Sequence, residues 1–155
     1  ADKITVNSAF FEKPEVISDI VNKYGSQAVV LSLDVKKIHN EYELFYNNAK
    51  QKSQISLDEA LNKAQSLMVG EIMINDVCRD GVMNGLDMDL IVNLRKKVNT
   101  PLIVAGGCCE MRDFSKAFNA GVDAVAAGSI FHWVGESVVS IKNYLNDEDI
   151  NVRTL

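Results

Sequence analysis

Strand-like and helix-like patterns of apolar residues alternate along the chain. Short runs rich in apolar and β-branched residues predict strands at residues 4–7, 28–33, 71–77, 101–105 and 124–127. Those at 28–33 and 101–105 are continuously apolar, which is typical of strands buried on both faces. Between the strands, apolar residues recur at helical spacing and predict helices near residues 14–24, 56–67, 87–98, 111–120 and 136–145. This alternation predicts an α/β fold in which helices cover a parallel sheet.

Local signals mark the ends of several of these elements. Ser56 with Glu59 three residues later predicts a capping box, and Asp87 predicts the start of the next helix. Gly25 predicts the end of the first long helix. Residues 42–46 alternate between polar and apolar and predict a small hairpin strand.

Glycine-bearing turns follow three of the predicted strands at their carboxyl ends. Gly81 lies in the loop after residue 77, Gly106 and Gly107 follow residue 105, and Gly128 and Ser129 follow residue 127. Backbone N–H groups without a neighbouring side chain can approach an anion closely, and ligands of parallel α/β folds bind at this end of the strands. One such turn alone is equally well explained by tight-turn geometry. Two of them one strand–helix unit apart favour a phosphate site.

Two aspartates and two histidines are the candidates for acid–base or metal chemistry. Asp34 follows a buried apolar run and is a candidate general acid or base, with a capping role as the alternative. Asp80 has the same two interpretations, and a role in organising its loop is favoured. His39 and His132 have no partner at a metal-ligand spacing, so no metal site is predicted.

Composition restricts the functional classes. The chain has 155 residues, a net charge of −5 and three cysteines, and its pI is about 5.0. The negative charge argues against nucleic-acid binding, and no apolar run approaches the ~18 residues of a membrane span. An odd cysteine count, in which Cys108 and Cys109 are adjacent, indicates a reduced cytoplasmic protein with structural thiols. Because a strand-like run begins almost at Ala1, which is not a methionine, we expect a fragment or a processed product.

Short motifs occur in a fixed order along the chain. They are Asp2-Lys3, Asn7-Ser8-Ala9, Tyr24-Gly25-Ser26-Gln27, Leu33-Asp34-Val35-Lys36, Gly70-Glu71-Ile72, Arg79-Asp80-Gly81, Ala105-Gly106-Gly107 and Ser129-Ile130-Phe131-His132. In order and spacing they resemble the cyclase subunit of imidazole glycerol phosphate synthase. The resemblance covers the C-terminal half of that family, whose members are complete (βα)₈ TIM barrels. It implies that residues 1–155 form one domain, the C-terminal (βα)₄ half-barrel, with parallel strands and outer helices.

The resemblance also implies roles for individual residues. Asp34 matches a catalytic aspartate of the family, and a second one, on the first strand of the barrel, lies outside this chain. Lys3 and Glu71 match a charged gate that admits ammonia, and Asp2 and Gln27 fall on the face where a glutaminase docks. The residues expected to hold substrate phosphate, from the resemblance and the turns together, are Asn7, Ser8, Gly81, Gly106, Gly107, Gly128 and Ser129.

The implied reaction is a lyase-type cyclisation in histidine biosynthesis. Ammonia from a glutaminase joins a bis-phosphorylated phosphoribulosyl-formimino-aminoimidazole carboxamide ribotide, which yields imidazole glycerol phosphate and aminoimidazole carboxamide ribotide. Such a reaction needs proton transfer at two ends of one substrate, two phosphate anchors and a dry path for ammonia. It needs no cofactor and no metal. The half-barrel alone is expected to be inactive.

Departures from the family pattern keep two alternatives open. Cys78 stands where the family usually has an aspartate, and Ala105 replaces the serine before the two glycines. Residues 34–37 and 126–129 also resemble paralogues found beside surface-polysaccharide genes, which pass ammonia to a sugar amidotransferase. A further alternative is a noncatalytic half-barrel that serves assembly.

A half-barrel is also expected to associate. Its first and last strands would have open edges, and its inner face, with Val6, Leu31, Leu33, Ile74 and Ile103, would be exposed to water. We therefore expect a homodimer, or association with the missing N-terminal half.

Overall fold

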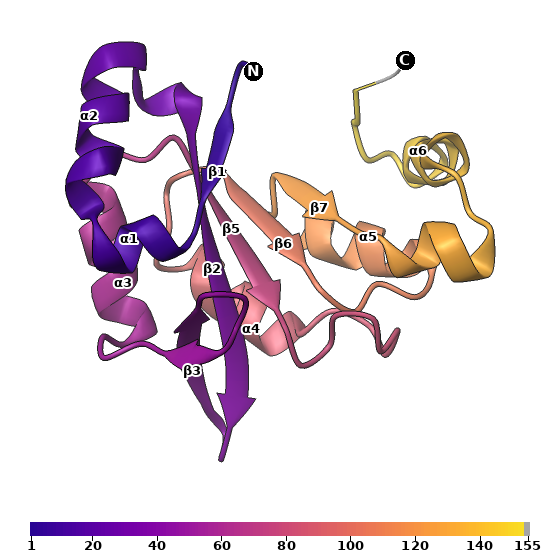
Figure 1. Ribbon diagram of the computed structural model, residues 1–155. Helices are drawn as coiled ribbons and strands as arrows, with labels where there is room; N and C mark the ends of the chain where they lie inside the picture. The colour runs from indigo at the N-terminus through magenta and orange to yellow at the C-terminus, as the bar shows by residue number, and fades with distance from the viewer. Residues whose placement is uncertain (154–155) are drawn as a thin grey trace.

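The computed structural model describes residues 1–153 and consists of one curved sheet with helices along it (Figure 1). The strands are β1 (Ile4–Val6), β2 (Val29–Ile38), β3 (Glu41–Tyr46), β4 (Gln51–Lys52), β5 (Glu71–Asp76), β6 (Leu102–Ala105) and β7 (Ala124–Ala126). The helices are α1 (Ser8–Glu12), α2 (Pro14–Tyr24), α3 (Leu57–Ser66), α4 (Met88–Arg95), α5 (Met111–Asn119) and α6 (Val138–Asp147). A 3₁₀ turn at Ser26–Ala28 precedes β2, and a π-helical turn at Ile130–Val134 follows β7.

The core of the sheet is parallel, as the alternating pattern predicts. In space its parallel strands run β1, β2, β5, β6 and β7. The last of them, β7, is followed by α6, so the arc holds five strand–helix units, one more than the expected (βα)₄. An antiparallel hairpin of β2 and β3, extended by β4, projects from the carboxyl end of β2. This arrangement is that of a half TIM barrel, in which each parallel strand is followed by a helical connection.

The local signals act as the sequence predicts. Ser56 and Glu59 form a reciprocal capping box at the start of α3. The Asp87 side chain caps α4 by accepting a hydrogen bond from the Leu90 N–H, at 3.0 Å. Gly25, with φ of +87°, follows the last residue of α2. None of the helices in residues 1–153 combines the length and the apolar character that a membrane crossing needs.

The two faces of the sheet differ in a way that corrects one expectation. Leu31, Leu33 and Ile74 are almost completely buried, on the helix-covered face, so the expectation that they are exposed to water is wrong. Neighbouring residues along the same strands, such as Asp34 and Asn75, lie on the concave face and are half-buried. Val6 pairs with Leu31 and shares the covered face. The concave face therefore presents polar and small side chains, and Ile103 is one of its few large apolar residues.

Several exposed apolar side chains lie at the two edges of the arc. Figure 1 shows α2 at one side of the molecule and α6 at the other, and β1 and β7 are the two end strands of the parallel arc. Ile4, Val16 and Tyr24 are exposed at the first edge. Trp133, which is 79% exposed, and Val138 mark the second edge. Each edge strand, β1 or β7, pairs with a single neighbour within the described part of the chain.

Candidate functional site

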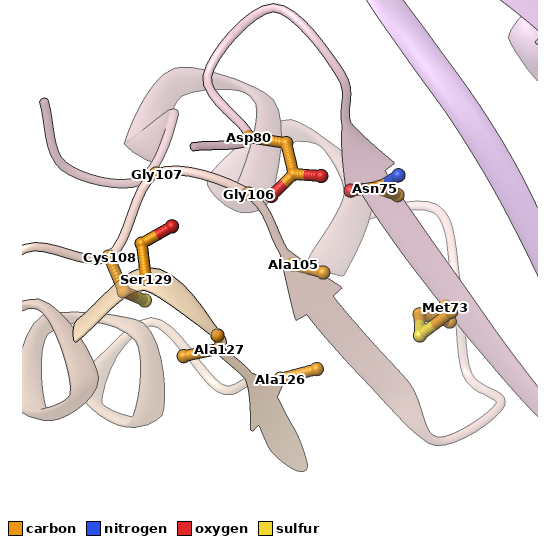
Figure 2. A pocket seen from close by; sticks show the side chains of 11 residues that line it. Met73, Asn75, Asp80, Ala105, Gly106, Gly107, Cys108, Ala126, Ala127 and Ser129 are labelled. Atoms are coloured by element: carbon orange, nitrogen blue, oxygen red, sulfur yellow. The ribbon is translucent and has the colours of Figure 1, made fainter. Parts of the chain in front are cut away.

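A pocket lies where β5, β6 and β7 end at the carboxyl side of the sheet (Figure 2). Its volume is about 270 Å³. Figure 2 shows Asp80 and Asn75 on one side of the pocket and Ser129 and Cys108 on the other. The lining residues are Met73, Asn75, Asp80, Ala105, Gly106, Gly107, Cys108, Ala126, Ala127, Gly128 and Ser129. The pocket thus brings together both glycine turns that follow β6 and β7, and no lysine or arginine is among these residues.

The turn after β6 requires glycine at two consecutive positions. Gly106 and Gly107 have φ angles of +97° and +104°, in the region that side chains disfavour. A Cβ atom on Gly106 would lie 2.4 Å from the Asp76 carbonyl oxygen, and one on Gly107 would lie 2.3 Å from the Gly85 carbonyl oxygen. Within the described residues, the N–H groups of Gly107 and Cys108 donate no hydrogen bond to a protein acceptor. This turn therefore offers bare N–H groups beside an open pocket, as an anion cradle needs.

The turn after β7 is built differently. A Cβ atom added to Gly128 would meet nothing within 4 Å, and its φ is not in the left-handed region. Glycine is therefore not required there by conformation or by space. Ser129 precedes the π-helical turn and adds a hydroxyl group to the pocket lining.

Asp34 adjoins this pocket through its neighbour on β5. Asp34 and Asn75 are partners in the register of β2 and β5. The Asn75 side-chain amide donates a hydrogen bond to Asp34 Oδ1 at 3.1 Å, and Asn75 itself lines the pocket. One carboxylate oxygen of Asp34 is thereby oriented, and a general acid or base needs a fixed orientation of this kind.

The predicted phosphate ligands fall into separate groups. Gly106, Gly107, Gly128 and Ser129 share the pocket. Asn7 and Ser8 follow β1, which is separated from β6 by two strands, so the structure does not bring them to the same pocket. There the Asn7 amide donates to the Ser32 carbonyl at 2.9 Å, and Ser8 Oγ accepts the Asn47 N–H at 3.1 Å. Gly81 lies in the loop after β5 but is not among the lining residues.

The residues implied for ammonia and for docking lie at the other end of the sheet. The Lys3 ammonium forms an ion pair with Glu71, which joins the start of β5 to the residue before β1. Asp2, Lys3 and Gln27 help to line a second pocket there, of about 520 Å³. These four residues are therefore neighbours in space, although Glu71 is distant from the others in sequence.

The pocket also contains residues that sequence reasoning assigned otherwise or missed. Asp80, for which a loop-organising role was favoured, lines the pocket, as do Asn75 and Met73. The sequence carried part of the signal for the last two, because alternate residues of a strand share a face. The register that pairs Asn75 with Asp34 comes from the structure alone. Burial raises the pKa of the Cys108 thiol to about 12, so this pocket residue stays protonated and unreactive at neutral pH.

Comparison with known proteins identifies the family of this chain. The histidine biosynthesis protein family matches residues 1–135. The chain belongs to this family. Among its curated relatives is the imidazole glycerol phosphate synthase subunit HisF of Chlorobium phaeobacteroides, 38% identical over 99% of this chain and 61% of the relative. The subunits HisF of Thermotoga sp. and Oceanobacillus iheyensis are each 35% identical, over 99% of this chain. The chain spans about three fifths of the length of these relatives.

Proposed function

We propose that this chain supplies one phosphate site, part of a second one, and one acid–base group of an ammonia-dependent cyclase of the imidazole glycerol phosphate synthase type. The observation that carries the proposal is the pocket in which the Gly106–Gly107 turn exposes N–H groups beside the Asn75–Asp34 pair. The similarity to curated HisF subunits over 99% of the chain supports it. The substrate is a bis-phosphorylated phosphoribulosyl-formimino-aminoimidazole carboxamide ribotide, and the products are imidazole glycerol phosphate and aminoimidazole carboxamide ribotide.

In this proposal each end of the long substrate is held by backbone and hydroxyl donors. The turns after β6 and β7 hold one phosphate with N–H groups and the Ser129 hydroxyl. Asn7 and Ser8 lie two strands away and contribute to a separate phosphate position. Fixing both ends brings the reacting centre over the concave face, where Asp34 moves a proton as the imidazole ring closes.

Ammonia arrives, in the same proposal, from a glutaminase at the opposite end of the sheet. The Lys3–Glu71 ion pair lies there at the entrance to the concave face, and Asp2 and Gln27 belong to the docking surface. A path that is shielded from water keeps ammonia unprotonated and therefore nucleophilic. Three free cysteines fit the reducing conditions of the cytoplasm, where such a pathway would operate.

The exposed apolar edges support association with further chain. The first edge carries Ile4, Val16 and Tyr24, and the second carries Trp133 and Val138. We propose that either the remainder of a barrel or a second copy of this chain covers both edges, because edge strands otherwise present unpaired backbone groups. Sedimentation at micromolar concentration tests this. A well-folded monomer that binds no hydrophobic dye would contradict it.

The catalytic part of the proposal is tested with a completed barrel. The chain is joined behind the N-terminal two fifths of the Chlorobium phaeobacteroides relative, and ammonium-dependent cyclisation is measured. Asp34→Asn should reduce the rate by at least about 100-fold, because it removes the acid–base group, and should leave phosphate binding unchanged. Asp89→Asn, at an exposed position of α4, is the matched control. A rate for Asp34→Asn within tenfold of the control would remove Asp34 from the mechanism. An inactive barrel that still binds phosphate would favour a noncatalytic or ammonia-passing role.

A further inference from the structure

The guanidinium group of Arg79 is engaged within the protein although its loop borders the pocket. Arg79 lies in the loop between β5 and α4, and its side chain is 31% exposed. Its Nε atom lies 3.4 Å from Oδ2 of Asp76, the last residue of β5, whose side chain is 7% exposed. Its Nη1 atom donates to the Gly85 carbonyl oxygen at 3.1 Å. Longer contacts of 3.4 Å join Nη1 to the backbone and side-chain oxygens of Asn84.

Both residues that Arg79 joins lie against the glycine turn after β6. The Gly85 N–H donates to the Gly107 carbonyl at 2.9 Å. A Cβ atom added to Gly107 would lie 2.3 Å from the Gly85 carbonyl oxygen. A Cβ atom added to Gly106 would lie 2.4 Å from the Asp76 carbonyl oxygen. The Cβ atom of Arg79 is 3.0 Å from the same point on Gly107. The two glycines are therefore held between the end of β5 and the end of the loop that Arg79 ties to it.

The guanidinium group of Arg79 contacts acceptors at the two ends of this loop and does not line the pocket. Arg79 is not among the residues that line the pocket, whereas its neighbour Asp80 is. No cationic side chain lines the pocket, so an anion bound there would depend on the position of backbone N–H groups. Hydrogen-bond donors that are displaced by even 1 Å lose much of their effect on a bound group.

We propose that Arg79 is a positioning residue for the anion cradle: by bridging Asp76 and Gly85 it holds the loop against Gly106 and Gly107. The proposal rests on the proposed function, because it assumes that this turn binds substrate phosphate. It differs from the simpler view that an arginine near a phosphate site acts through its positive charge. In the positioning view both partners of the Arg79–Asp76 contact are needed, although one of them is an anion.

Because Arg79 and Asp76 carry opposite charges, substitution of each residue distinguishes a positioning role from a role of charge. Asp76→Asn removes a negative charge close to the cradle and breaks the contact with Arg79. If charge alone mattered, this change would strengthen anion binding. If position matters, it weakens binding, in the same direction as Arg79→Gln. The amide oxygen of asparagine can still accept the Cys78 N–H, which Asp76 Oδ1 accepts at 3.0 Å, so the turn at the strand end retains that bond.

The experiment measures inorganic phosphate binding to the 155-residue chain by calorimetry, with the Gly107 and Cys108 amide signals followed by NMR to locate the ion. Arg79→Gln should weaken binding about tenfold. Arg79→Lys should weaken it severalfold, because one ammonium group cannot bridge both partners as the guanidinium fork does. Arg95→Gln is the matched control, since Arg95 is 29% exposed and pairs with Asp123 at 3.0 Å, away from the pocket. It should bind phosphate as the wild-type chain does.

The outcomes separate this inference from the proposed function. Weaker binding in Arg79→Gln and in Asp76→Asn, with little further loss in the double variant, supports positioning because both changes break one contact. Tighter binding in Asp76→Asn overturns it in favour of charge, and equal binding in Arg79→Gln and Arg95→Gln overturns it outright. If Arg79→Gln does not fold, the Arg79→Lys result decides. Absence of phosphate binding in the wild-type chain overturns both the cradle of the proposed function and this inference.

Discussion

Replacing Gly107 by alanine would put a methyl group into space that the fold has already filled. The position combines two obstacles, a φ angle of +104° and a Gly85 carbonyl oxygen 2.3 Å from the site of the new Cβ atom. The obstructing atom belongs to the backbone, so it cannot move away as a flexible side chain could. Because the Gly85 N–H also bonds to the Gly107 carbonyl, relief of the clash requires that the whole loop after β5 moves.

The expected loss in the free energy of unfolding follows from these two obstacles. A side chain in left-handed backbone costs about 1–2 kcal/mol. Forcing an extra methyl group into a packed site costs typically about 1–3 kcal/mol. The free energy of unfolding of Gly107→Ala should therefore fall by about 2–5 kcal/mol, which is a large part of the stability of a small domain.

Two other glycines provide matched controls. Gly81 has a φ of +76° but nothing within 4 Å of its Cβ position, so Gly81→Ala should show the backbone cost alone, about 1–2 kcal/mol. Gly128 has neither obstacle, so Gly128→Ala should be neutral or stabilising by up to about 1 kcal/mol. Urea unfolding followed by circular dichroism gives the three free energies by linear extrapolation.

The series also tests the cradle. Phosphate binding by calorimetry should be lost in Gly107→Ala, because the methyl group or the displaced loop disturbs the N–H groups. If Gly107→Ala is no less stable than Gly81→Ala, the close approach of Gly85 to Gly107 is wrong. If it is less stable and yet binds phosphate as the wild-type chain does, the turn is a structural feature and not the anion site.

Three further predictions concern other parts of the fold. Burial alone would raise the pKa of Asp113, but N–H donors from Cys109 and Glu110 and the charge of Lys116 lower this pKa on balance. The ionised Asp113 carboxylate therefore stabilises the fold fully above the ordinary pKa of 3.8. This stabilisation is lost as pH falls through the lower pKa of the folded state. The free energy of unfolding lost in Asp113→Asn, about 1–3 kcal/mol near neutral pH, should therefore shrink on acidification; an equal difference at all pH values would contradict this. Ser56→Ala should destabilise by about 0.5–2 kcal/mol through loss of the capping box, and an unchanged melting temperature would argue against the cap. The exposed Cys78 should react at once with an aromatic disulfide reagent, whereas the buried Cys108, with its pKa raised to about 12, should react only on unfolding; equal rates would show that the Cys108 site opens readily.

Features that depend on near neighbours in the chain could be predicted from the sequence. The capping box at Ser56 and the cap at Asp87 depend on residues three positions apart. The alternation of apolar runs and helical spacing depends on segments of about ten residues. The extent of β2 could not be predicted in this way. Its last residues, from Asp34 to Ile38, are mostly polar and are in a strand because β3 pairs with them.

The sequence does not show which face of a strand the helices cover. The run at residues 28–33 is apolar on both sides, so alternation does not distinguish inside from outside. The sequence alone therefore predicts Leu31 and Leu33 on the exposed inner face, whereas helix packing buries them. The curvature of the sheet and the position of the helices decide this, and both are properties of the whole chain.

The candidate site also combines features that are predictable from the sequence with features that depend on the fold. The glycine-bearing turns at strand ends and the carboxylate after the apolar run of β2 were predictable from the sequence, because a tight turn and a buried strand are each specified by a few consecutive residues. Which of these residues come together depends on the tertiary fold. It joins Gly107 to Ser129 and Asp34 to Asn75, and it separates Asn7 from all of the pocket residues after β6. The physical reason is that distance across a sheet depends on the order of its strands, which arises from long-range pairing and is not encoded in any single segment.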